Sequence, residues 1–140
     1  MTFSGACYES ILDIERLVCI EGYRVKAIQI KLKYMQQSRD KEGIAETQSL
    51  LNLTTDFYNM LVDIEQEMIA KIEQTNRLLN DVEGDIFIRK FVKNQENTQI
   101  QNELFLSPAA VSKYCKAIKD KMINTEYGKE ILETLKKEGN

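Results

Sequence analysis

The residues of this chain best suited to a chemical task are four lysines that follow its single Ser-Pro pair. Ser107 is a favoured N-cap and Pro108 suits the first helical position, so the pair predicts the start of a helix. The lysines in that helix are Lys113, Lys116, Lys119 and Lys121. The segment 108–124 holds these four and a single Asp, a net charge of +3 in a chain whose total is −3. Ammonium groups in this arrangement neutralise phosphates, which indicates nucleic-acid binding.

The elements that must position these lysines form a predicted helix-turn-helix. Ile100 and Leu104 lie one helical turn apart before the Ser-Pro pair. After it, Val111, Cys115 and Ile118 share one helical face, away from the lysines. In a helix-turn-helix the second helix enters the DNA major groove, with its first residues nearest the base edges.

This geometry divides the candidate DNA contacts into two sets, because phosphate contacts position a protein and base contacts specify the sequence. The candidates near base edges are Ser107, Ala109, Ala110, Ser112 and Lys113. The candidates for phosphate contact are Lys116, Lys119, Lys121, Arg89, Lys90 and Lys93. Between the two helices, Phe105 occupies a turn position often taken by Gly, and a positive φ there carries a steric cost.

The run from Phe91 to Ser107 resembles the C-terminal segment of the ArpU/RinA group of phage-encoded transcriptional regulators. Its pattern is an aromatic-aliphatic pair, a Gly, an Ile-Ala pair and a Ser before the recognition helix. Phe91-Val92, Ile100 and Ser107 match that spacing without a gap. The resemblance implies a helix-turn-helix similar to region 4 of sigma factors, a role in phage or prophage transcription, and host RNA polymerase as a further partner.

Upstream of this unit, residues 1–80 predict a long antiparallel helical hairpin that drives assembly. Helices are expected at about 7–38 and 45–79, with a polar bend at 36–43. Their apolar residues recur in steps of three and four, as in a coiled coil. The predicted oligomerisation residues are Ile14, Val18, Val25, Ile28, Leu32, Phe57, Leu61, Ile64 and Met68. A hairpin this thin has little core of its own, so a homodimer or higher homo-oligomer is expected.

The C-terminal unit, residues 85–140, is predicted to begin after a joint at 80–84. A bracing helix is expected at 85–93, and a closing apolar segment at 126–137 packs either on this unit or on a partner. Residues 1–84 hold nine basic and fourteen acidic residues, a net of −5, whereas residues 85–140 hold ten and eight, a net of +2. This division is typical of a DNA-binding unit beside a separate assembly module.

Composition argues against several other classes. The chain contains no histidine, the commonest general base and metal ligand, and no Gly-rich phosphate loop, so we expect neither an enzyme nor a cofactor. Its three cysteines form no CxxC pair. No apolar stretch reaches the roughly 18–20 residues of a membrane span, and the N-terminus does not read as a signal peptide. A cytoplasmic protein without a membrane partner is the expectation.

The resulting prediction is an all-α, sequence-specific regulator that binds double-stranded DNA. The first alternative is a phage small terminase subunit, which also joins a DNA-binding unit to an oligomerising hairpin but closes into a ring. The second is a helical protein that binds another protein and no DNA, such as an inhibitor of a host factor. Three departures from the resembled pattern favour that second alternative, namely Asn94, Gln101 and Phe105.

Overall fold

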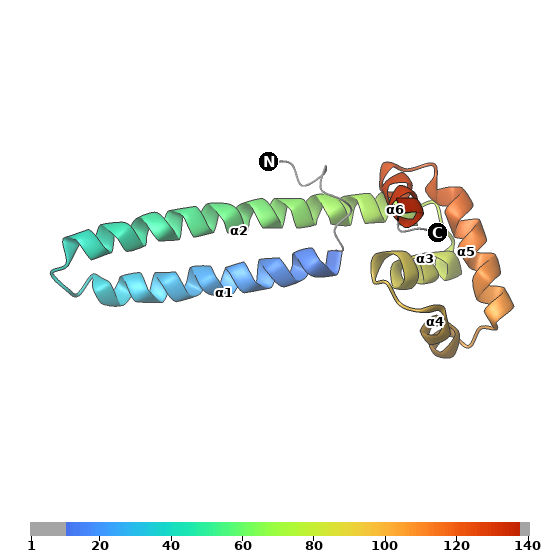
Figure 1. Ribbon diagram of the computed structural model, residues 1–140, viewed down its shortest axis with the longest axis horizontal. Coiled ribbons are helices and arrows are strands. Elements are labelled where there is room, and N and C mark those ends of the chain that lie inside the picture. The colour runs from blue at the N-terminus through green and yellow to red at the C-terminus, as the bar shows by residue number, and fades with distance from the viewer. Residues whose placement is uncertain (1–10, 138–140) are drawn as a thin grey trace. The chain divides into compact units, whose positions relative to one another are not determined.

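A computed structural model of the protein describes residues 11–137, and all regular structure in that range is helical (Figure 1). The elements are α1 (Ile11–Met35), α2 (Lys41–Asn76), α3 (Asp81–Phe87), the π-helical segment η2 (Ile88–Val92), α4 (Asn97–Leu104), α5 (Pro108–Met122) and α6 (Glu126–Lys137). The chain divides into two compact units. The hairpin unit comprises residues 12–66, and the helix-turn-helix unit comprises Ile11 and residues 67–137 of the described range. The predicted all-α hairpin followed by a helix-turn-helix is confirmed.

The hairpin unit pairs α1 with the first part of α2 in antiparallel orientation (Figure 1). The bend is tighter than the predicted 36–43, because the Asp40 carboxylate accepts a hydrogen bond from the Gly43 N–H at 2.9 Å. This cap starts α2 at Lys41 rather than near residue 45. Of the predicted first helix, residues 7–10 lie outside the described range, and α1 ends at Met35.

The predicted oligomerisation residues fall into three groups in this structure. Buried residues are Ile14, Ile28, Leu32 and Leu61. Half-buried residues are Val18, Val25, Ile64 and Met68, and Phe57 is exposed. A side chain that is already buried within one protomer is not available to a second copy. Ile14, Ile28, Leu32 and Leu61 are therefore packing residues of the protomer, and an intermolecular surface has to be sought elsewhere on the hairpin.

The helix-turn-helix unit begins inside α2, after Gln66, rather than at the predicted joint of 80–84. The predicted joint at 80–84 is helical from Asp81 onward, because Asn80 and Glu83 form a capping box that starts α3. The Asn80 side chain accepts from the Glu83 N–H at 2.8 Å, and Glu83 Oε1 accepts from the Asn80 N–H at 3.0 Å. The bracing helix therefore starts at Asp81, and the last ten residues of α2 belong to this unit.

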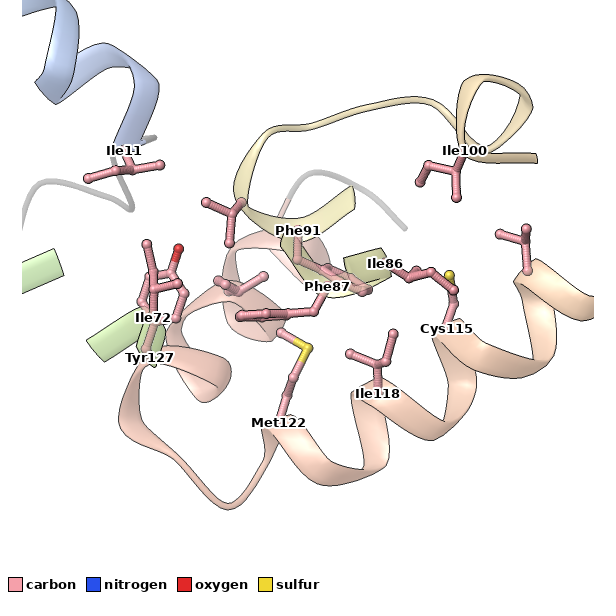
Figure 2. Close-up of a cluster of buried hydrophobic side chains, with 13 residues drawn as sticks. Ile11, Ile72, Ile86, Phe87, Phe91, Ile100, Cys115, Ile118, Met122 and Tyr127 are labelled. Carbon is pink, nitrogen blue, oxygen red and sulfur yellow. The ribbon is translucent and has the colours of Figure 1, made fainter. Parts of the chain in front are cut away.

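The core of this unit gathers side chains from every helix around Phe87 (Figure 2). The Phe87 ring lies 6.3 Å from that of Phe91 and meets the ring of Tyr127 edge-on at 6.4 Å. Ile118 and Met122 of α5 are fully buried in the same cluster. Aromatic pairs of this kind contribute about 0.5–1.5 kcal/mol beyond area burial. Phe87 and Phe91, both from the segment predicted to brace the unit, are thus central to its core.

The closing segment forms α6 and packs on its own unit, which decides between the two arrangements left open by the sequence. Ile131 is buried in the common core. At the start of α6, the Thr125 hydroxyl lies 2.8 Å from that of Thr75 in α2 and accepts a hydrogen bond from the Gly128 N–H at 3.1 Å. The contact between the two threonines connects the start of α6 with the end of α2.

Candidate nucleic-acid interface

The turn between α4 and α5 is built around a residue with left-handed backbone. Phe105 follows Leu104 with φ 56° and ψ 44°, and the Leu106 N–H donates to the Gln101 carbonyl at 3.0 Å. This hydrogen bond satisfies a carbonyl of the last turn of α4. Ser107 then caps α5, because its Oγ accepts from the Ala110 N–H at 3.1 Å. The predicted helix start is confirmed, and Phe105 adopts a positive φ at the turn position often taken by Gly.

The second helix, α5, has one buried and one exposed side. Its buried residues are Val111, Cys115, Ile118 and Met122, spaced at four, three and four positions. The exposed side, called here the α5 lysine face, consists of Ala109, Ser112, Lys113, Lys116, Lys119 and Asp120. Three lysines against one aspartate make this face basic, and its first turn carries only small side chains. Small residues at a helix start allow the backbone to approach base edges closely.

The predicted base-edge candidates differ in availability. Ala109, Ser112 and Lys113 are exposed on the lysine face, whereas Ala110 is half-buried. The Ser107 Oγ accepts the capping hydrogen bond from the Ala110 N–H. A hydroxyl also has one O–H donor, and this donor is not used by the cap. Lys113 is the only charged member of this set, and it lies in the second turn of α5.

Arg89, a predicted phosphate contact, is occupied by ion pairs within the unit. Its Nε donates to Asp85 Oδ1 at 2.7 Å, one helical turn away, and its Nη1 pairs with Glu103 of α4. The Asp85 hydrogen bond is the main cause that raises the pKa of Arg89 above its ordinary value, and Glu103 adds to it. Arg89 therefore joins η2 to α4 through these ion pairs, and its role as a phosphate contact stays a prediction.

Lys121 and Lys90 are occupied as well. The Lys121 Nζ donates to Glu83 Oε1 at 2.6 Å, so it completes the capping box of α3 from α5. The Lys90 Nζ donates to Asn97 Oδ1 at 2.6 Å, at the first residue of α4. Both lysines therefore connect helices within the unit, although 42% of the Lys121 side chain stays exposed, and their phosphate contacts stay predictions. Of the predicted phosphate contacts, Lys93, Lys116 and Lys119 remain exposed.

Cys115 lies beneath the lysine face and is a packing residue. It is buried among the apolar residues of the core. Burial raises the pKa of its thiol, against an opposite effect of Lys90 and Lys119. A neutral, buried thiol is a poor nucleophile and metal ligand. Cys19, in contrast, is exposed on α1, and Cys7 lies outside the described residues.

Phe105 is a feature of the interface whose role the sequence analysis did not assign. Its side chain is 93% exposed, more than any other large apolar side chain of the described residues. Its backbone adopts a conformation that costs a residue with a Cβ about 1–2 kcal/mol. Asn94 has a similar φ of 59°, but Asn tolerates this region far better than Phe. An exposed ring on strained backbone at the turn is a reason to include Phe105 in the candidate interface.

We expect Phe105→Gly to raise the stability of the protein. Gly adopts φ > 0 without steric cost, and an exposed ring contributes little burial, so a gain of about 0.5–1 kcal/mol is expected after the larger entropy of the unfolded chain is included. The midpoint of thermal unfolding measures it. Asn94→Gly is the matched control, with a smaller gain. A clear loss of stability in Phe105→Gly would show that the ring has intramolecular contacts of value.

The described residues hold neither a metal site nor a membrane-spanning helix. Among residues 11–137, no three Cys, Asp or Glu side chains gather as a metal site would require. In the same range, no helix combines the length and apolar character needed to cross a membrane. Comparison of the chain with protein-family models, curated proteins and solved structures finds no match.

Proposed function

We propose that this protein is a sequence-specific DNA-binding transcriptional regulator that inserts α5 into the major groove of double-stranded DNA. The observation that carries the proposal is the α5 lysine face, which is exposed along a helix whose other side is anchored in the core. Lys113, Lys116 and Lys119 lie on that face, and among the described residues none of them makes an ion pair. Cations left unpaired beside small residues suit a phosphate backbone flanking a groove.

The contacts within the unit support the same proposal indirectly. Arg89 and Lys90 connect the bracing segment with α4, and Lys121 connects α5 with α3. A recognition helix has to be held rigidly if its base contacts are to discriminate between sequences. The resemblance of residues 91–107 to phage regulators extends the proposal to a phage- or prophage-encoded protein acting on DNA in the cytoplasm, with host RNA polymerase as a further partner.

The test compares Lys113→Ala with Lys116→Ala in binding to duplex DNA from the protein's own genome. Lys113 lies nearer the start of α5, so its loss should relax sequence preference, at about 1–3 kcal/mol for a good base contact. Loss of Lys116 should weaken binding to all sequences alike and flatten the salt dependence by about one phosphate contact. Lys33→Ala, at an exposed lysine of the hairpin, controls for the lost charge. If DNA binding is unchanged in both Lys113→Ala and Lys116→Ala, the α5 lysine face is only solvated surface and the proposal is wrong.

A further inference from the structure

The turn between α4 and α5 carries an aromatic ring that is not part of the core. Leu104 and Leu106 both pack against the core, whereas the side chain of Phe105 between them is 93% exposed. The backbone of Phe105 is left-handed, with φ 56°, which costs a residue with a Cβ folding free energy. An exposed ring returns almost none of that cost through burial. Strain and exposure at the same residue indicate a role outside the folded unit.

The position of this ring follows from the residues on either side of it. Phe105 lies two residues before Ser107, which caps α5, and Ser107, Pro108 and Ala109 are all exposed (Figure 1). This end of α5 is the one that the proposed function inserts into the major groove, since the first residues of a recognition helix reach base edges. Phe105 therefore belongs to the part of the surface that approaches the bases.

Hydrogen bonds hold the backbone of the turn on both sides of Phe105. The N–H groups of Phe105 and Leu106 both donate to the Gln101 carbonyl, the second at 3.0 Å. On the other side, Ser107 Oγ accepts from the Ala110 N–H at 3.1 Å. A ring whose backbone is held before binding loses less conformational entropy when it makes a contact. The turn thus presents Phe105 in a form suited to a specific contact.

The chemistry of the ring limits what it can contact on DNA. Phenylalanine has no hydrogen-bonding group to read the polar edge of a base and no charge to pair with a phosphate. The apolar group that base pairs present in the major groove is the C5-methyl group of thymine. Insertion of apolar side chains between base steps is typical of proteins that bind the minor groove, whereas α5 would enter the major groove. A thymine methyl group is therefore the contact that suits Phe105.

We propose that Phe105 is a specificity-determining residue that packs its ring on the C5-methyl group of a thymine in the major groove. This inference rests on the proposed function and deepens it, because it names one base that the DNA site must contain. The exposed lysines of α5 would position the protein on phosphates, whereas Phe105 adds a contact that depends on sequence. The stability gain expected of Phe105→Gly then has a counterpart, since the same change removes a base contact.

The test compares two duplexes, the best-bound fragment of the protein's own genome and the same fragment with deoxyuridine in place of thymidine. This replacement removes the methyl group and leaves the hydrogen-bonding groups of the base pair in place. The unchanged protein should bind the uracil fragment about 3- to 10-fold more weakly, the scale of one or two buried methyl groups. Phe105→Gly and Phe105→Asn, both suited to left-handed backbone, should lose most of this preference. Phe105→Tyr keeps the ring and should keep the preference.

The matched control is Asn94→Gly, at the other non-Gly residue with positive φ in the described range, and it should bind both fragments as the unchanged protein does. The slope of log affinity against log salt should be the same in the two variants without the ring, since no phosphate contact is lost. A preference for thymine that is equal with and without the ring, or absent throughout, would overturn the proposal and leave DNA binding standing. Absence of binding to any fragment would overturn both.

Discussion

Gly128→Ala should destabilise the helix-turn-helix unit by about 3 kcal/mol or more, near the upper end of overpacking effects. Gly128 is buried in the first turn of α6, where a Cβ would lie 2.1 Å from the Met122 carbonyl oxygen and 2.7 Å from its carbonyl carbon. Both atoms belong to the backbone at the end of α5, so no side-chain rotation relieves the overlap. Either α6 moves away from α5 or the last turn of α5 opens, and both changes disturb the core around Ile131.

Urea unfolding followed by circular dichroism measures this loss as a lower transition midpoint. Gly84→Ala is the matched control, since Gly84 is also a buried helical glycine of the same unit. Its added Cβ would meet only the end of the Asn76 side chain, at 2.6 Å, which can rotate away. The gain in helix propensity from Gly to Ala, about 1 kcal/mol, should offset that adjustment. Equal midpoints for Gly128→Ala and the unchanged protein would contradict the close approach of α6 to α5.

Glu83→Ala should cost about 2 kcal/mol, because one buried carboxylate serves two partners. Its Oε1 accepts from the Asn80 N–H and from Lys121 Nζ, and the carboxylate side chain is 7% exposed against 42% for the lysine. The lysine can return to water when the pair is lost, which keeps the cost below that of a fully buried ion pair. Loss of the cap contributes about 1 kcal/mol and loss of the charged hydrogen bond the remainder. Asp81→Ala, an exposed first-turn acid of the same helix, is the control and should cost much less.

The Glu83 contribution should also depend on pH. The hydrogen bond from Lys121, followed by that from the Asn80 N–H, lowers the pKa of Glu83 below its ordinary value of 4.5, against the opposing effect of burial. A carboxyl whose pKa is depressed by folding stabilises the protein above its unfolded-state pKa and loses that contribution as the pH falls through the folded-state pKa. The difference in unfolding free energy between the unchanged protein and Glu83→Ala should therefore shrink below about pH 4.5. A difference that stays constant down to acid pH would show that the charge of Glu83 contributes nothing.

Local signals in the sequence were sufficient for the helix-turn-helix, since caps and turn chemistry involve neighbouring residues. Ser107 and Pro108 marked the start of α5, and the helical spacing of Val111, Cys115 and Ile118 marked its buried side. The capping box that starts α3 is also present in the sequence, as Asn80 followed three positions later by Glu83, although the break in the apolar pattern there predicts a joint. The spacing of an N-cap residue and a Glu would have placed the helix start correctly.

The sequence did not indicate which side chains pair between helices that are far apart along the chain. Lysines at helical spacing look alike whether they face solvent or a carboxylate from another helix, so nothing local distinguished Lys116 from Lys121. The same limit applied to the hairpin. α2 carries two heptad series, and the more apolar one, which includes Phe57 and Ile64, is not the one that closes the hairpin. Periodicity finds apolar stripes, but it does not tell which neighbour covers each of them.

The central claim, that the α5 lysine face binds the DNA backbone and groove, is tested most directly by titrating the intact protein with duplex fragments of its own genome over a series of salt concentrations. Lys93, Lys116 and Lys119 are the exposed phosphate candidates, and each contact should contribute a slope of about −0.9 in log affinity against log salt. We predict a slope of about −3 per protomer, together with one fragment bound well above the rest. Absence of binding to every fragment at low salt, or binding whose affinity does not change with salt, would contradict the account.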